Sequence, residues 1–340
     1  MRFIVPPVHH HWIGPDPRRR QYLQFLLGSA AGMALSGCAD LVPALRVGSI
    51  VFPTYEYAFL ARDLGFIDAA QVRLVEYLAT TYALRALAAG QIEAAQLTLD
   101  EVISARASGI GLSVVLVLDV SEGCDAVYAR SPMTLAELDG KRVAVEEGAT
   151  GAVLLDGLLR AANLTVDRIH KVPSNLALSA GEFKRGEADL VVTAEPWASQ
   201  IERDGGFRLF DSRQIPNRII HVLAVRTESI ESHLSAIRQL VAGIVRARQH
   251  HLSEPDAMAV KLAPRLQLEP SQVAQVFVGL SIPTLADDRR MLEPEGQIVV
   301  AAQALQEVML ASGLLRLKQP QSSLIHALVD ARFLPDGGTA

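Results

Sequence analysis

The segment Ala94-Ala95-Gln96-Leu97-Thr98-Leu99-Asp100-Glu101 joins a short apolar strand pattern directly to the start of a helix. Thr98 and Glu101 have the spacing of a capping box, in which the side chain of each residue bonds to the backbone N–H of the other. Gly109 ends the predicted helix, and the uninterrupted apolar run 114–118 then predicts a strand that is covered on both faces. This strand–helix–strand unit is typical of an α/β fold.

The same alternation continues on both sides of this unit. Further strand patterns lie at residues 45–48, 72–77, 142–145, 188–193 and 221–225, and helix patterns lie between most of them. Beyond Glu228 the pattern is helical, without strands of its own. Alternating strands and helices with short connections predict mostly parallel sheets flanked by helices.

The composition limits the possible classes of protein. The chain has 340 residues, of which 50% are hydrophobic and 20% charged, so it can bury a large core and is not wholly disordered. Its formal net charge of −5 argues against nucleic-acid binding, which needs a basic face. Two cysteines form neither a disulfide framework nor a four-ligand zinc site, and no apolar run indicates a polytopic membrane protein.

The N-terminal region has the pattern of a bacterial export signal. Arg18-Arg19-Arg20 precede a short apolar segment that ends in Leu35-Ser36-Gly37-Cys38. Arg19-Arg20-Gln21-Tyr22-Leu23 resembles a twin-arginine signal, and residues 35–38 resemble a lipobox, in which the cysteine sulfur is acylated. We therefore predict an export signal over residues 1–38 and lipidation at Cys38. The alternative is a membrane-spanning anchor, since the uncharged stretch 21–39 is just long enough to cross a bilayer.

Five segments of the chain point to a known family. They read ARDLGF at 61–66, AAGQIEAA at 88–95, GKRVAV at 140–145, GEADLVVTAEP at 186–196 and FDS at 210–212. In this order they resemble the periplasmic substrate-binding proteins of ABC transporters for nitrate, sulfonates and taurine, pyrimidine-precursor-binding relatives included. The resemblance extends over about residues 45–315.

The resemblance implies a two-lobed periplasmic-binding-protein fold of type II. In this α/β fold each lobe is a mostly parallel sheet flanked by helices, and two strands cross between the lobes. The lobe boundaries that the resemblance implies are residues 45–128 and 224–320 for lobe one, 129–223 for lobe two and 321–340 for a C-terminal tail. The crossing strands are expected at residues 127–130 and 221–226.

Loops that follow predicted strands form the candidate binding site. In open α/β sheets, ligands bind at the carboxyl ends of the strands, where helix N-termini present unpaired N–H groups. The candidate ligand-binding residues in these loops are Ser49, Tyr55, Tyr57, Thr98, Leu99, Ser121, Thr150, Gly151, Glu195, Trp197 and Asp211.

Some of these residues have a structural alternative. Thr98 and Thr150 can cap helices without contacting a ligand. Tyr55 and Tyr57 lie two positions apart, so on a helix at most one of them faces the cleft. Asp211 suits a hydrogen bond between lobes as well as it suits a ligand contact.

Glu195 and Trp197 restrict the ligand most, if they face the cleft. A carboxylate in a cleft repels a simple inorganic anion, so Glu195 favours a zwitterion, a cation or a hydrogen-bonding heterocycle. The indole of Trp197 is expected to cover the ligand, because its amphipathic ring otherwise needs another covering surface.

No catalytic residue, metal ligand or cofactor is predicted. Cys124 has no histidine nearby in the sequence, and His170 and His221 stand alone at strand positions, where we interpret them as structural. His250 and His251 lie near a predicted helix end without carboxylate or cysteine partners. The sequence therefore favours a binding protein over an enzyme.

The predicted function is that of an extracytoplasmic solute-binding lipoprotein. It would capture a small polar solute, such as a sulfonate, taurine, nitrate or a pyrimidine-like molecule, and deliver it to the permease subunits of an ABC importer. We expect a monomer at the periplasm or the outer cell surface, tethered to the membrane by its lipid. The alternatives are an enzyme of pyrimidine or thiamine-precursor metabolism on the same scaffold, and a ligand-sensing module.

Overall fold

The computed structural model describes residues 43–148, 150–317 and 324–336. The predicted export signal and Cys38 lie outside the described residues. Within the described residues, no helix is both long enough and apolar enough to span a bilayer.

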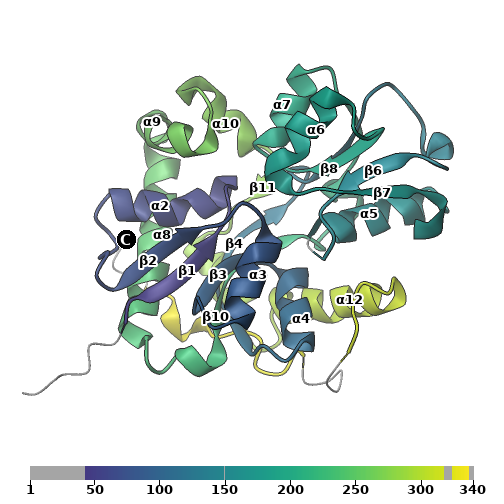
Figure 1. Cartoon of the computed structure of the whole chain (residues 1–340). Helices are drawn as coiled ribbons and strands as arrows, with labels where there is room; N and C mark the ends of the chain where they lie inside the picture. The colour runs from purple at the N-terminus through teal and green to yellow at the C-terminus, as the bar shows by residue number, and fades with distance from the viewer. Residues whose placement is uncertain (1–42, 149, 318–323, 337–340) are drawn as a thin grey trace, which may run out of the picture. The chain divides into compact units, whose positions relative to one another are not determined.

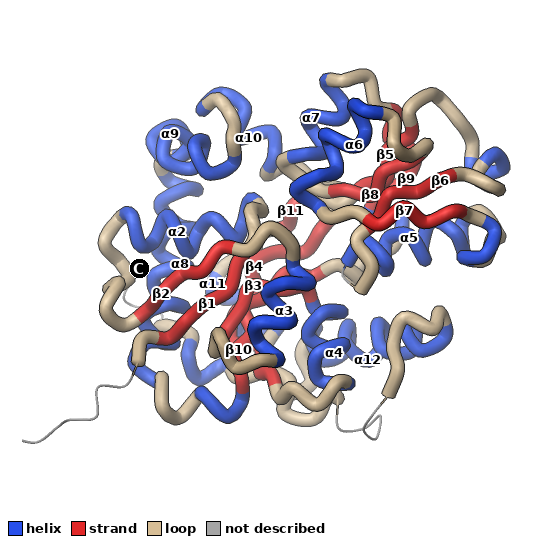
Figure 2. The backbone as a smooth tube through the Cα atoms, viewed as in Figure 1, coloured by secondary structure: helices blue, strands red, loops and turns tan. Residues whose placement is uncertain are grey.

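The strands form two sheets (Figures 1 and 2). Among the described residues, the first sheet has the order β11-β4-β10-β3-β1-β2 and the second has the order β7-β6-β8-β5-β9. The strands of the first sheet are β1 (Leu45–Ser49), β2 (Val72–Glu76), β3 (Ala94–Thr98), β4 (Leu112–Ser121), β10 (Ile220–Arg226) and β11 (Leu280–Ser281). Those of the second sheet are β5 (Ala126–Ala129), β6 (Arg142–Val145), β7 (His170–Pro173), β8 (Leu190–Thr193) and β9 (Phe207–Asp211).

Both sheets are mixed rather than mostly parallel. β1 pairs parallel with β2 and β3, and β6 pairs parallel with β7 and β8, as the alternation of strands and helices predicts. In contrast, β10 pairs antiparallel with β3 and β4, and β5 pairs antiparallel with β8 and β9. β5 and β10 are the strands by which the chain enters each sheet from the other, so no helical crossover fixes their direction. The predicted α/β class is confirmed.

The chain passes between the sheets at positions different from those expected. It leaves the first sheet after β4, at Ser121, and enters the second with β5 at Ala126. It returns between β9 and β10, at residues 212–219. Residues 127–130, expected to cross, therefore lie mostly in β5, and residues 221–226 lie within the first sheet. A strand buried on both faces shows no alternation of polarity, so the pattern of β5 did not reveal which sheet contains it.

Helices cover both faces of each sheet. Those that pack with the first sheet or with one another beside it are α2 (Glu56–Asp63), α3 (Thr80–Ala88), α4 (Leu99–Ala107), α8 (Leu234–Ser253), α9 (Pro255–Leu266), α10 (Val273–Val276), α11 (Leu285–Met291) and α12 (Gln297–Ala311). The helices of the second sheet are α5 (Thr150–Ala161), α6 (Ser179–Arg185) and α7 (Trp197–Arg203). One buried apolar cluster joins α2, α8 and α9 to one face of the first sheet, and another joins α3, α4 and α12 to the opposite face (Figure 1).

Candidate functional site

A small cavity of about 60 Å³ lies between residues of the two sheets. The first sheet and its loops contribute the end of β3, the start of α4 and part of β10, and the second contributes the start of α5 and the end of β8. The polar side chains of the lining are Tyr55, Thr80, Thr98, Glu101, Asp125, Glu146, Thr150, Thr193 and His221. The remaining wall consists of Ile50, Phe52, Gly151, Leu154, Leu176, Val192 and Ala194.

The cavity lies at the carboxyl ends of parallel strands, where ligands bind in open α/β sheets. Thr98 ends β3 and caps α4, and the capping box is present because the Thr98 backbone N–H donates to Glu101 Oε2 at 2.8 Å. Thr150 begins α5, which follows β6 in the second sheet. The Oγ1 atoms of Thr98 and Thr150 lie 2.5 Å apart, so the two helix starts meet directly beside the cavity.

A second polar contact joins the two sheets near this point. Thr81, in the first turn of α3, donates to Glu146 Oε1 from its backbone N–H at 3.2 Å and from its hydroxyl at 3.0 Å. Glu146 follows β6 and lines the cavity. These contacts and the Thr98–Thr150 pair join the two sheets beside the cavity.

His221 is held in place by a chain of buried side chains. Its Nδ1 atom lies 2.7 Å from Asp119 Oδ1, and the Thr54 hydroxyl donates to the other oxygen of Asp119. The imidazole stacks on Phe52 with ring centroids 4.1 Å apart and contacts the edge of Tyr55 at 5.5 Å. With Nδ1 occupied by Asp119, the Nε2 atom is the ring nitrogen left for a group in the cavity.

Carboxylates outweigh burial in setting the charge of this histidine. Burial by itself lowers the pKa of the His221 imidazole, because it disfavours the charged form. The carboxylates of Asp119, Asp125 and Asp100 outweigh that effect and raise the pKa above its usual value.

Burial acts in the opposite direction on the carboxyl groups. It raises the pKa of Glu101 well above the usual value, and the neighbouring Asp100 raises it further. Burial also raises the pKa of Asp125, although His221 and the Ser121 hydroxyl oppose the shift. The site therefore concentrates acidic groups in a place where ionising them is costly.

Four of the predicted site residues line the cavity, namely Tyr55, Thr98, Thr150 and Gly151. The others from the first sheet lie elsewhere. Ser49 donates to the backbone of Ile50, and Leu99 is buried in the apolar core. Tyr57 bonds to His251 Nδ1 at 2.8 Å. Ser121 contacts Ser212 Oγ at 2.8 Å.

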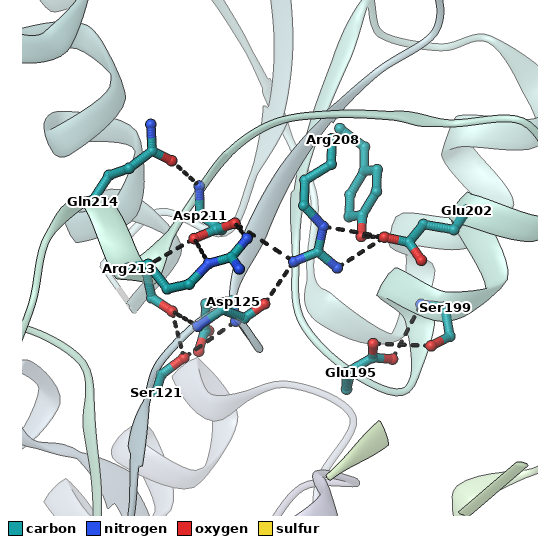
Figure 3. Close-up of polar contacts among 12 residues, drawn as sticks. Ser121, Asp125, Glu195, Ser199, Glu202, Arg208, Asp211, Arg213 and Gln214 are labelled. Atoms are coloured by element: carbon teal, nitrogen blue, oxygen red, sulfur yellow. Dashed lines mark hydrogen bonds and ion pairs between the residues drawn. The ribbon is translucent and has the colours of Figure 1, made fainter. Parts of the chain in front are cut away.

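Glu195 and Trp197 lie outside the cavity lining. Figure 3 shows Glu195 turned toward Ser199, whose backbone N–H and hydroxyl donate to it at 3.1 and 2.9 Å. Trp197 is buried in an apolar cluster with residues of α6, such as Phe183. In this part of the chain the described lining residues are Val192, Thr193 and Ala194, which precede Glu195.

Asp211 forms ion pairs instead of lining the cavity. It accepts from Arg213 at 2.6 and 3.0 Å, and Arg208 lies 3.7 Å away (Figure 3). Burial raises the pKa of the Asp211 carboxyl, but the guanidinium of Arg213 outweighs burial and lowers it below the usual value. Because Arg208 also donates to the backbone oxygen of Gly123 at 2.7 Å, this group fixes the segment that crosses between the sheets.

Sequence reasoning missed several residues of the cavity: Phe52, Thr80, Glu101, Asp125, Glu146 and His221. Asp125 lies in the loop between β4 and β5, and Glu146 lies in the loop after β6. The strand pattern predicted both loops. Glu101 was recognised only as a helix cap. His221 gave no local signal, because it reaches the site through the pairing of β10 beside Thr98 of β3.

The described residues contain no group of three or more histidine, cysteine or acidic side chains that could hold a metal ion. Cys124 is buried, and burial raises the pKa of its thiol well above the usual value, with Asp125 adding to the shift. Its thiolate is therefore disfavoured, which is the opposite of what a nucleophile needs.

A family model and solved structures resemble this chain. The model of the NMT1-like family matches residues 40–265. A search of the curated proteins gives no match. The alkanesulfonate-binding protein SsuA from Xanthomonas axonopodis pv. citri is 20% identical, with a TM-score of 0.71 over 85% of this chain and 98% of that chain.

Two other solved structures are similar. The periplasmic aliphatic sulphonate-binding protein SsuA from Escherichia coli is 20% identical, with a TM-score of 0.64 over 82% of this chain and 92% of that chain. The periplasmic nitrate-binding protein NrtA from Synechocystis PCC 6803 is 12% identical, with a TM-score of 0.66 over 85% of this chain and 86% of that chain. These similarities confirm the predicted periplasmic-binding-protein fold.

Proposed function

The chain belongs to the NMT1-like family, and we propose that it is an extracytoplasmic solute-binding protein that delivers a small polar solute to an ABC importer. Its partners are then the solute and the permease subunits, and it acts as a monomer. We place one lobe on the first sheet and the other on the second, with the chain crossing between them at residues 122–125 and 212–219.

The observation that supports this function is a polar cavity lined by both sheets at their strand ends. A solute in this cavity would contact Thr98 and His221 from the first sheet and Thr150 and Thr193 from the second. Such a solute holds the two halves together, because each half supplies only part of its hydrogen-bond partners. Capture between two halves is the geometry that a solute-binding protein needs.

Thermal unfolding of the full chain tests the proposal. A protein-free extract of bacterial cells is expected to raise the unfolding temperature by several degrees, because a ligand at 100 times its Kd stabilises the folded state by about 2.7 kcal/mol. The matched control is the same extract after removal of small molecules by dialysis. An unfolding temperature that no extract or growth medium changes would contradict solute binding.

The proposed lipid anchor depends on Cys38, which lies outside the described residues. We expect Cys38→Ala to prevent acylation, so that the protein leaves the membrane fraction or stays unprocessed. Cell fractionation and the mass of the mature chain measure both effects. A mutant with unchanged mass that stays in the membrane fraction at the parent level would reject the lipoprotein hypothesis.

A further inference from the structure

We propose that the solute is a small organic cation with N–H donors, such as a primary amine or an amidinium, and not a sulfonate, nitrate or another anion. The inference rests on the proposed function and concerns the same cavity. It follows from an unpaired buried carboxylate, from the balance of charges around the cavity, and from the aromatic wall.

One carboxylate oxygen of Asp125 accepts no hydrogen bond in the described part of the chain. The residue is 7% exposed and lines the cavity, and its Oδ2 atom is buried without a hydrogen-bond partner in the described part of the chain. A buried acceptor left unpaired destabilises the folded protein, so a donor from a ligand in the cavity that Asp125 lines would stabilise it. An N–H group on a cation satisfies the oxygen and its charge together.

The charged groups that face the cavity are mostly acidic. Glu101 comes from α4, Asp125 from the crossing segment and Glu146 from the loop after β6. The imidazole of His221 faces them from β10, but its own partner Asp119 is a further carboxylate. The phenol of Tyr55 completes the titratable groups of the lining. Asp100, which is not a lining residue, accepts from the Thr150 hydroxyl at 3.3 Å.

No arginine or lysine of the described residues lines the cavity. Arg208 of β9 and Arg213 of the returning segment are both paired with Asp211. An anion in the cavity would therefore meet three acidic side chains and, among the described lining residues, no full positive charge other than an imidazolium. Like charges this close disfavour binding, whereas a cation gains from each carboxylate.

The aromatic wall and the size of the cavity fit the same ligand. Phe52, Tyr55 and His221 pack together at one side, and a cation beside this aromatic wall is attracted by its rings. A volume of about 60 Å³ suits a molecule of few heavy atoms.

The pKa values of Glu101 and Asp125 are raised, so ligand affinity should depend on pH. A bound cation favours their ionised forms, so its affinity should increase with pH.

Three probes with one two-carbon skeleton distinguish the charge classes. Ethanolamine is a cation, taurine a zwitterion and isethionate an anion at pH 7. Calorimetric titration of the full chain is expected to give a Kd for ethanolamine at least tenfold below that for taurine, with isethionate and nitrate weaker still. Tighter binding of taurine, isethionate or nitrate than of ethanolamine would overturn the inference.

Fractionated cell extract decides the case in which none of the probes binds. We expect only the fraction retained by a strong cation exchanger at pH 7 to raise the unfolding temperature. An increase with the anion-exchanger fraction or the unretained fraction overturns the charge assignment and leaves the solute-binding function intact. If no fraction raises the unfolding temperature, the proposed function itself is wrong.

Asp125→Asn tests the residue on which the inference depends. The change preserves size and removes the charge, so we expect it to weaken the cationic probe or fraction about ten- to a hundredfold. Asp204→Asn is the matched control, because it makes the same charge change at an exposed position outside the cavity. If Asp125→Asn does not fold, Glu146→Gln, at a half-buried position, should weaken binding in the same direction. Equal affinities of the cavity variant and the control would overturn the assignment.

Discussion

The Arg248→Met variant is expected to lose about 3–5 kcal/mol of unfolding free energy at pH 7, since breaking a buried ion pair leaves an uncompensated charge. Arg248 of α8 is 3% exposed and Asp288 of α11 is fully buried. The Arg248 Nη2 atom donates to Asp288 Oδ2 at 2.7 Å. Urea denaturation of the parent and the variant measures the difference.

The loss should depend on pH, because Asp288 titrates. Burial raises the pKa of this carboxyl to about 6, even with Arg248 opposing the shift. A folded-state pKa above the unfolded value means that the group's contribution to stability is full below about pH 4 and is lost as pH rises through 6. Without Arg248 the pKa rises further, so the deficit of the variant should be larger at pH 8 than at pH 5.

A double variant provides the control for this prediction. Arg248→Met combined with Asp288→Leu replaces the ion pair by two apolar side chains and is expected to recover most of the lost stability. An equal deficit at pH 5 and pH 8, or no recovery in the double variant, would show that Arg248 stabilises the helix interface by packing alone.

Local patterns predicted the elements of this fold well. The segment 94–118 forms β3, α4 and β4 as expected, because a capping box and an uninterrupted apolar run are properties of neighbouring residues. The fold class also followed from the alternation of such units. The position where the chain changes sheets did not follow from local patterns, because β5 is buried throughout and suits either sheet.

The candidate site depends on contacts that no local pattern contains. Thr98 was predicted and lines the cavity, but its neighbour His221 comes from β10, which inserts antiparallel between β3 and β4. Glu195 is the opposite case, a predicted site residue that lies outside the cavity lining. Its position after a strand suggested a ligand contact, yet the carboxylate bonds to Ser199 one helical turn later. Pairing order and rotamer choice decide which polar side chains meet, and both are set by tertiary packing.

Gly279 positions the segment that presents Asp125 to the cavity. Its backbone oxygen accepts from the N–H groups of Glu122 at 2.8 Å and Cys124 at 3.2 Å. Its φ is +86°, and an added Cβ would lie 2.9 Å from the backbone N of Cys124 and 3.0 Å from the backbone carbon of Gly123. A side chain at this position thus has an unfavourable backbone conformation and clashes with the backbone of Gly123 and Cys124.

We therefore expect Gly279→Ala to lower the unfolding free energy by about 2–5 kcal/mol, of which about 1–2 comes from the left-handed backbone and about 1–3 from the clash. Gly65→Ala is the matched control, because Gly65 has φ +74° and open space around its Cβ position, so it should show only the backbone part. Urea denaturation of both variants measures the difference.

Since relief of the clash displaces the Cys124 backbone beside Asp125, Gly279→Ala should also weaken solute binding in the folded fraction, whereas Gly65→Ala should not. Equal destabilisation of the two variants would mean that the crossing segment yields to the added methyl group, and Asp125 would then not be held rigidly at the cavity.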